Sequence, residues 1–182
     1  MAKLVQTTYG DALFDLAVEE SRVDALFDEA EAVIKAFDDN DELGKFLNHP
    51  KIKKEEKEEV IKNIFGEFVS KDMTGLLVIM VSKDRQAKIV DTLKFFEEKV
   101  KEYKKIGVVS VSTARPLSDE QKERVESRLR DTTDYVSFEI TYNVDESLIG
   151  GMVIRIGDRV VDSSIKTKID EIAKNLKKIQ LA

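Results

Sequence analysis

Residues 107–113 read GVVSVST, and the sequence changes its periodicity at this stretch. Val109, Val111 and Thr113 alternate with two serines, and a period of two in a β-branched run predicts a strand. Upstream of this stretch, apolar residues recur at the helical period instead. We therefore expect a domain boundary here, with an all-helical domain over residues 1–105 and a strand-containing domain over residues 106–182.

Six stretches before the boundary carry an apolar stripe at helical spacing. They lie at residues 9–16, 23–37, 43–47, 60–68, 73–81 and 89–103. The third must end near His49, because Pro50 biases the residue before it away from the helical region. Together these stretches predict a six-helix N-terminal bundle.

The fifth stretch, residues 73–81, is apolar almost all round. Its period fits either a central helix or a buried strand, and its helical neighbours favour the helix. Its apolar residues suit the core of the bundle and also a groove for a foreign helix, and the sequence leaves both possibilities open. The sixth stretch is expected to end at Gly107.

A strand, a helix and a second strand are predicted at the start of the C-terminal domain. Ser118 and Gln121 have the spacing of a capping box, which opens a polar helix that runs to about Arg130. A second β-rich run follows at residues 135–142.

The end of the chain predicts a β-hairpin and a terminal helix. The hairpin strands lie at residues 152–156 and 160–161, and Gly157 supplies the positive φ that a tight turn needs. Ser163 or Ser164 then caps a final amphipathic helix. The fold class is thus α + α/β: an N-terminal six-helix bundle followed by a small C-terminal α/β domain.

Composition argues against several classes of protein. The net charge is −6, the opposite sign from that of a protein that neutralises phosphates, so nucleic acid is not an expected partner. The chain has no cysteine, which removes disulfides, thiolate nucleophiles and the usual zinc sites. The longest apolar run, residues 76–81, is far below the ~20 residues of a membrane span. We expect membrane association only through partners.

The chemical motifs are also weak. The one histidine, His49, is expected to be structural or solvated. A calcium loop started at Asp39 would place Leu43 and Pro50 where oxygen ligands belong. The glycines at the start of the hairpin lack the lysine-serine pair of a phosphate loop. We therefore expect no catalytic, cofactor-binding or metal-binding residues, and no enzyme activity.

Three segments carry a resemblance to a known family: YGDALF at residues 9–14, FLNHPKI at residues 46–52, and the stretch 148–162, which contains IGGMVIRIGD. The whole chain resembles the delta subunits of bacterial F-type ATP synthases, which are equivalent to the mitochondrial oligomycin-sensitivity-conferring protein. The family's architecture of a six-helix bundle and a small α/β domain matches the one predicted from periodicity.

The resemblance implies a non-catalytic stator subunit. Such a subunit links the alpha/beta catalytic head to the peripheral stalk and so resists rotor torque during ion-gradient-driven ATP synthesis. It would lie at the cytoplasmic face of the cell membrane as a peripheral part of the complex. Residues 1–105 would bind the N-terminal helix of an alpha subunit in a groove between the first and fifth helices, and residues 106–182 would bind the C-terminal end of the stalk b subunit.

The resemblance also implies site residues. The alpha groove would be lined by Tyr9, Ala12, Leu13, Leu16, Leu76, Ile79, Met80 and Lys83, although some of these eight must face the bundle core instead. The b-subunit contact region would be the hairpin residues Met152, Ile154, Ile156 and Val161, with the final helix beside them.

Two other interpretations are open at this point. Composition alone permits a cytosolic helical adaptor unrelated to ATP synthase. A small enzyme that uses buried carboxylates is the second, and it would require a carboxyl group with a strongly raised pKa in a polar pocket.

Overall fold

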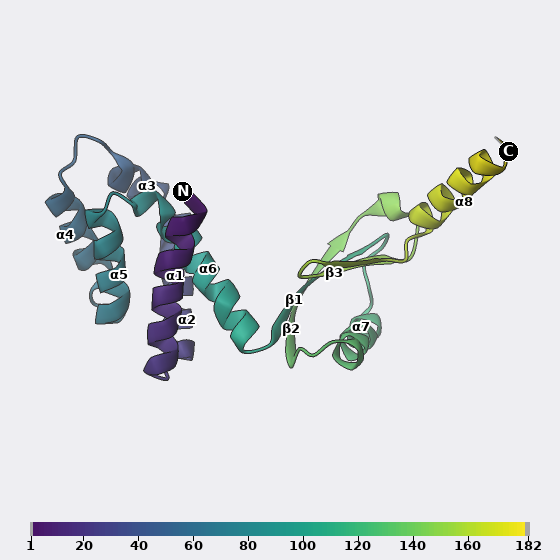
Figure 1. Cartoon of the computed structure of the whole chain (residues 1–182), viewed down its shortest axis with the longest axis horizontal. Helices are drawn as coiled ribbons and strands as arrows, with labels where there is room; N and C mark the ends of the chain where they lie inside the picture. The colour runs from purple at the N-terminus through teal and green to yellow at the C-terminus, as the bar shows by residue number, and fades with distance from the viewer. Residues whose placement is uncertain (1, 181–182) are drawn as a thin grey trace. The chain divides into compact units, whose positions relative to one another are not determined.

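The computed structural model describes residues 2–180, and the chain forms two compact units, one ending at Lys101 and the other beginning at Glu102 (Figure 1). The first unit is helical, and the second holds a four-stranded mixed sheet and two helices. The predicted α + α/β class is confirmed. Within residues 2–180 no helix combines the length and the hydropathy that crossing a membrane would require.

The helices of the first unit follow the apolar stretches of the sequence. They are α1 (Ala2–Glu19), α2 (Val23–Asp39), α3 (Asp41–Asn48), α4 (Lys54–Phe65), α5 (Lys71–Ser82), a 3-10 turn η1 (Gln86–Lys88) and α6 (Ile89–Tyr103). The ambiguous stretch 73–81 is helical, and α3 ends just before His49, as predicted.

Phe68 departs from the prediction. It was expected on the apolar stripe of the fourth helix, but α4 ends at Phe65 and Gly66 forms its cap. Phe68 lies beyond that cap with 81% of its surface exposed. Spacing alone could not exclude it, because Phe68 falls three residues after Phe65, which is a helical interval.

One continuous core fills the first unit. Its fully buried side chains come from all six helices and include Leu26, Leu47, Ile61, Leu77 and Phe96. Each such side chain contributes roughly 1.5–3 kcal/mol relative to exposure. The helices are therefore held by a shared interior rather than by their individual propensities.

The second unit is built on a four-stranded sheet. Its elements are β1 (Ile106–Thr113), α7 (Asp119–Thr132), β2 (Ser137–Val144), a 3-10 turn η2 (Glu146–Leu148), β3 (Met152–Ile156), β4 (Arg159–Asp162) and α8 (Ile165–Gln180). The strand order is β2-β1-β3-β4, with β1 and β2 parallel and the other pairs antiparallel.

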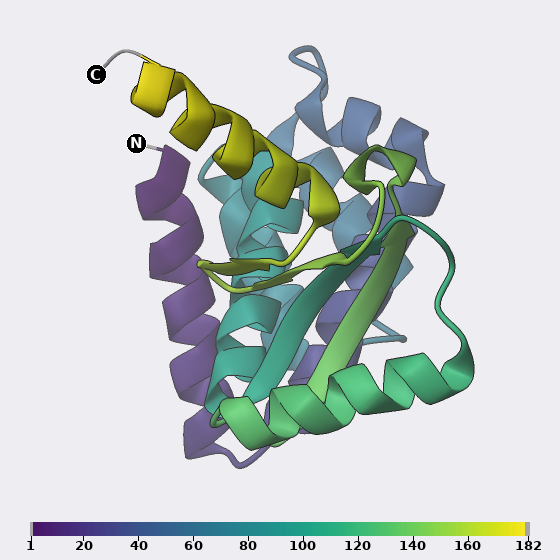
Figure 2. The same cartoon turned by 90° about the vertical axis from the view of Figure 1, so that its right-hand side faces the viewer.

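Helix α7 covers one face of this sheet (Figure 2). The capping box of Ser118 and Gln121 is present, as predicted. Val125 and Leu129 of α7 are buried in one cluster with Val109 and Val111 of β1. The alternation seen in residues 107–113 thus separates a face that packs on α7 from one that does not.

Gly107 does not end the last helix of the first unit, so that prediction was wrong. Helix α6 stops at Tyr103, Lys105 has a positive φ of 55°, and Gly107 is the second residue of β1. A Cβ at Gly107 would lie 2.9 Å from the Phe138 ring and 3.0 Å from the Tyr135 ring. Glycine is therefore required here for close ring packing.

The predicted hairpin and its turn are confirmed. Strands β3 and β4 pair from Val153 opposite Asp162 to Ile156 opposite Arg159, and Gly157 has a φ of +52°. Ser164 rather than Ser163 caps the final helix, because its hydroxyl accepts the Thr167 backbone N–H at 3.2 Å.

Candidate functional site

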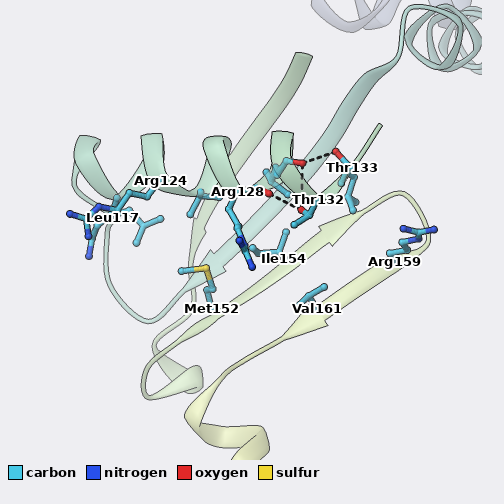
Figure 3. Close-up of a pocket in the computed structure, with 13 residues that line it drawn as sticks. Leu117, Arg124, Arg128, Thr132, Thr133, Met152, Ile154, Arg159 and Val161 are labelled. Carbon is cyan, nitrogen blue, oxygen red and sulfur yellow. Dashed lines mark hydrogen bonds between the residues drawn. The ribbon is translucent and has the colours of Figure 1, made fainter. Parts of the chain in front are cut away.

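An apolar groove lies between α7 and the β3–β4 hairpin of the second unit (Figure 3). Its volume is about 560 Å³. Residues of α7 and the segments flanking it form one wall, and the hairpin forms the floor. The lining residues are Leu117, Gln121, Arg124, Val125, Arg128, Leu129, Thr132, Thr133, Met152, Ile154, Ile156, Arg159 and Val161.

The sheet register explains the apolar floor. Ile154 of β3 stands opposite Val161 of β4, and opposed residues point to the same face of a sheet. Met152 and Ile156 lie two residues on either side of Ile154 and share that face. Val161 remains 60% exposed, since β4 is the edge strand beyond the reach of α7. The hairpin side chains implied by the resemblance therefore all meet in one groove.

Three arginines surround this apolar floor. Arg124 and Arg128 project from α7, and Arg159 projects from the hairpin turn (Figure 3). Arg124 pairs with Glu120 at 2.6 Å. The hydroxyls of Thr132 and Thr133 donate to carbonyl groups of α7, so they offer no free donor to a ligand. The groove suits an apolar segment that carries acidic groups along its sides.

The α1 and α5 residues implied by the resemblance divide into two sets. Leu13 and Met80 are buried, at 3% and 0% exposure, so neither can meet a partner without opening the core. The other six remain accessible in part or in full. Tyr9, Leu16 and Leu76 are half-buried, and Ala12, Ile79 and Lys83 are exposed.

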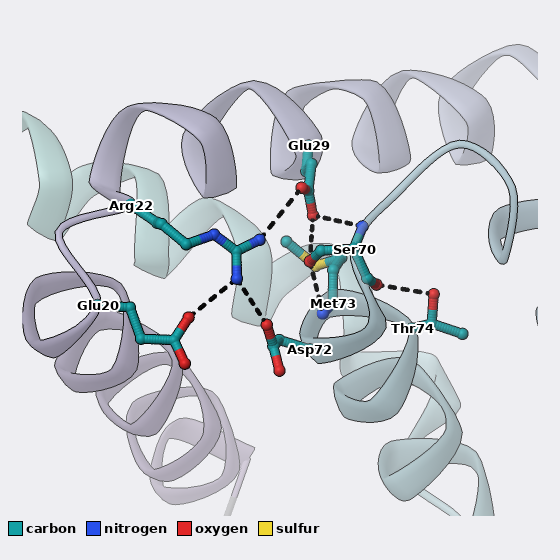
Figure 4. Close-up of polar contacts among 7 residues, drawn as sticks. All are labelled: Glu20, Arg22, Glu29, Ser70, Asp72, Met73 and Thr74. Carbon is teal, nitrogen blue, oxygen red and sulfur yellow. Dashed lines mark hydrogen bonds and ion pairs between the residues drawn. The ribbon is translucent and has the colours of Figure 1, made fainter.

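A polar network fixes the start of α5 beside the turn that joins α1 to α2 (Figure 4). The Arg22 guanidinium donates to Asp72 of α5 at 2.8 Å and to Glu20 of the turn at 2.9 Å. The hydrogen bonds to Glu20 and Asp72 raise the pKa of Arg22 above its ordinary value. Arg22 therefore links the end of α1 to the start of α5.

Ser70, the N-cap of α5, joins the same network through Glu29 of α2. Its backbone N–H and its hydroxyl both donate to the Glu29 carboxylate, at 3.0 and 2.7 Å. The hydroxyl oxygen also accepts the Met73 backbone N–H at 3.3 Å, which caps α5. Helix α1 also contacts η1, the turn that follows the other end of α5. Together these contacts set the spacing of the α1 and α5 faces.

Sequence reasoning did not find the arginines of the groove or the Arg22 network. Ser70 carried a local signal, since a serine directly before an apolar helical stretch is a typical N-cap. Arg22 and Arg128 carried none, because their partners and surroundings come from distant segments. His49, expected to be structural or solvated, is exposed, and its Nδ1 accepts the Lys51 backbone N–H at 3.2 Å. Among residues 2–180 no three His, Cys, Asp or Glu side chains gather as a metal site would need.

Comparison with known proteins identifies the family of this chain. A family model described as ATP synthase delta (OSCP) subunit matches residues 5–176. The chain belongs to this family. It is 52% identical over 181 residues to the ATP synthase subunit delta of Lachnoclostridium phytofermentans, covering 100% of both chains. It is 29% identical to that of Brevibacillus brevis, with 95% of this chain and 98% of the relative covered.

A solved structure shares the fold. A chain of the Toxoplasma gondii mitochondrial ATP synthase hexamer superposes with a TM-score of 0.73, covering 94% of this chain and 96% of the other at 20% identity. As a member of the delta (OSCP) family, the chain is a non-catalytic subunit of ATP synthase and a component of its peripheral stalk, the stator. The rival interpretation as an unrelated adaptor finds no support in these comparisons.

Proposed function

We propose that the chain joins the catalytic head to the peripheral stalk by binding a segment of a different subunit with each of its two units. The first unit, acting as a six-helix bundle, binds the N-terminal helix of an alpha subunit. The second unit binds the C-terminal end of the b subunit in the groove between α7 and the β3–β4 hairpin. That groove is the observation that carries the proposal, because it is a preformed apolar surface within a compact unit.

The groove has the character of a helix-docking site. An amphipathic helix buries an apolar face, and Ile154, Met152 and Val161 supply a floor for such a face. The charged ends of Arg128 and Arg159 lie at the sides and favour a partner with carboxylates flanking its apolar stripe. The exposure of Val161 means that part of this floor is still open to be covered.

The alpha site is supported by the accessible residues on α1 and α5. Ala12 and Leu16 are four residues apart on α1, and Leu76, Ile79 and Lys83 recur at steps of three and four on α5. Both sets therefore form stripes of the kind that accept a helix between two others. Leu13 and Met80 support this face from below, inside the core.

Mechanically, the subunit makes no bonds and breaks none. Two binding sites on one chain hold each partner close to its own site when the other partner is bound, which raises the effective concentration there. The linkage between the partners is therefore longer-lived than either contact alone. Holding alpha stationary relative to b resists rotor torque during ion-gradient-driven ATP synthesis. We place the subunit at the cytoplasmic face of the membrane, in contact with the bilayer only through the complex.

The test is calorimetric titration of the full chain with two peptides from the same organism, the alpha N-terminal helix and the b C-terminal segment. We expect one-to-one binding of each, simultaneous occupancy, and a negative heat-capacity change from apolar burial. Ile79→Ser should lower only the affinity for the alpha peptide. Phe68 is an exposed apolar residue outside α1 and α5, so Phe68→Ser should change neither affinity. A folded chain that binds neither peptide would contradict the proposal.

A further inference from the structure

Gly75 occupies the middle of α5, where glycine is unfavourable. The helix spans Lys71–Ser82, and an interior glycine weakens a helix relative to alanine because its backbone loses more freedom on folding. A glycine at such a position is explained structurally only where its surroundings need the missing side chain.

The fold of the chain itself supplies that reason for most of its glycines. Of the eight, all within the described residues, five would place a Cβ less than 3.0 Å from a neighbouring atom, and a sixth, Gly157, has a positive φ. Gly44 and Gly75 are the two that have neither a positive φ nor any atom within 4 Å of an added Cβ. Nothing inside the chain therefore requires glycine at position 75.

The neighbours of Gly75 on the surface point to an external partner. Ile79 lies one turn further along α5 and is 50% exposed, and Leu76 is half-buried beside it. A shallow cavity of about 300 Å³ adjoins Gly75 on the side of α4, and it is lined also by Lys62, Gly66, Lys71, Thr74 and Val78. Gly75 therefore lies on an open part of the α5 surface, with the exposed Ile79 one turn away and this cavity on its other side.

We propose that Gly75 is the point of closest approach between α5 and the alpha-subunit helix bound on the α1–α5 face. The inference rests on the proposed alpha site and assigns a specificity-determining residue within it. Helices normally pack with axes 8–10 Å apart, the distance depending on the side chains at the contact, and a glycine there permits the near end of that range. A methyl group at position 75 separates the two backbones and removes the contacts around Ile79.

The test pairs Gly75→Ala with Gly44→Ala in the full chain. Gly44 lies within α3 and is the matched control, because it has the same open space and lies outside α1 and α5. Both substitutions should raise the midpoint of thermal unfolding, by about 4–8 °C for a single unit of this size. Only Gly75→Ala should also lower the affinity for the alpha peptide. The loss should be about tenfold or more, because an added methyl group overpacks a tight contact.

The outcomes separate the inference from the function on which it rests. Unchanged peptide affinity in a stabilised Gly75→Ala chain, with wild-type binding intact and Ile79→Ser defective, overturns the role of Gly75 and leaves the alpha site standing. An equal loss of affinity in Gly44→Ala also overturns it, because replacing any helical glycine by alanine would then have the same effect as replacing Gly75. Absence of binding by the wild-type chain overturns the alpha site and Gly75's role together.

Discussion

The guanidinium of Arg22 lies 2.8 Å from the carboxylate of Asp72, a residue 50 positions further along the chain. Both side chains are 35% exposed, so water screens the pair only in part. The contact closes the corner where α1, α2 and α5 meet (Figure 4). It is thus a long-range determinant of how the two helices of the alpha site are spaced.

Removing Arg22 should loosen that corner without unfolding the unit. We expect Arg22→Ala to lower the midpoint of thermal unfolding by a few degrees at most, because partly exposed ion pairs contribute little. A double-mutant cycle with Asp72→Asn should give a coupling energy that shrinks in 1 M salt. A coupling energy that is unchanged by salt would contradict the electrostatic origin of the contact.

Ser70 should matter more than Arg22, because it caps α5 and also binds Glu29. We expect Ser70→Ala to lower the free energy of unfolding by about 1–2 kcal/mol, measured by urea denaturation. Ser82→Ala is the control at the other end of the same helix, where the hydroxyl only donates back to Ile79. Its free energy of unfolding should stay within about 0.5 kcal/mol of wild type.

Val161 and Val160 offer a matched test of the groove. They are neighbours on β4 with 60% and 52% exposure, but only Val161 lines the groove, because adjacent strand residues point to opposite faces. We expect Val161→Asp to lower the affinity for the b-subunit peptide by about tenfold or more, and Val160→Asp to leave that affinity unchanged. Equal effects of the two changes would place the b contact elsewhere.

Asp162 should make the start of α8 sensitive to acid. Its carboxylate accepts the Thr167 hydroxyl at 2.7 Å and the Ser164 backbone N–H at 2.8 Å, and these hydrogen bonds lower its pKa. A lowered pKa in the folded chain means that the carboxylate stabilises the fold above the unfolded pKa of about 3.9. That stabilisation is lost as the pH falls through the lower, folded pKa.

Hydrogen exchange at the Ser164 and Thr167 amides can follow this change. Asp162→Asn should speed exchange at neutral pH, and the difference from wild type should disappear at a pH below the folded pKa of Asp162. Asp170→Asn removes the same charge further along α8 and should not affect these two amides. A difference between wild type and Asp162→Asn that persisted at the lowest pH would rule out the carboxylate as its cause.

The sequence predicted those features that depend on neighbouring residues. The capping box of Ser118 and Gln121 and the turn at Gly157 are set by local backbone chemistry, so they could be recognised without the fold. The apolar period in residues 23–37 likewise required only the sequence.

The remaining features depend on segments that meet only in the folded chain. The end of α6 was misplaced because Gly107 was interpreted through a local rule for helix ends, whereas rings from β2 and the segment before it require the glycine. The resemblance supplied the hairpin residues but not the opposite wall, since Arg128 reaches the groove only after α7 packs on the sheet. The burial of Leu13 and Met80 could not be predicted either, because apolar residues at helical spacing occur both in a core and in a binding groove.

The position of β1 in the sheet has a consequence for mechanical load. Strand β1 follows α6 in the chain and is central in the sheet, with eight residues opposite β2 and five opposite β3. Ladder hydrogen bonds run across a strand, so a pull along β1 strains both ladders in shear and many bonds must fail together. An edge strand such as β4 could instead peel away one bond at a time. The polypeptide therefore enters the second unit through β1, the strand that should resist a pulling force better than the edge strand β4.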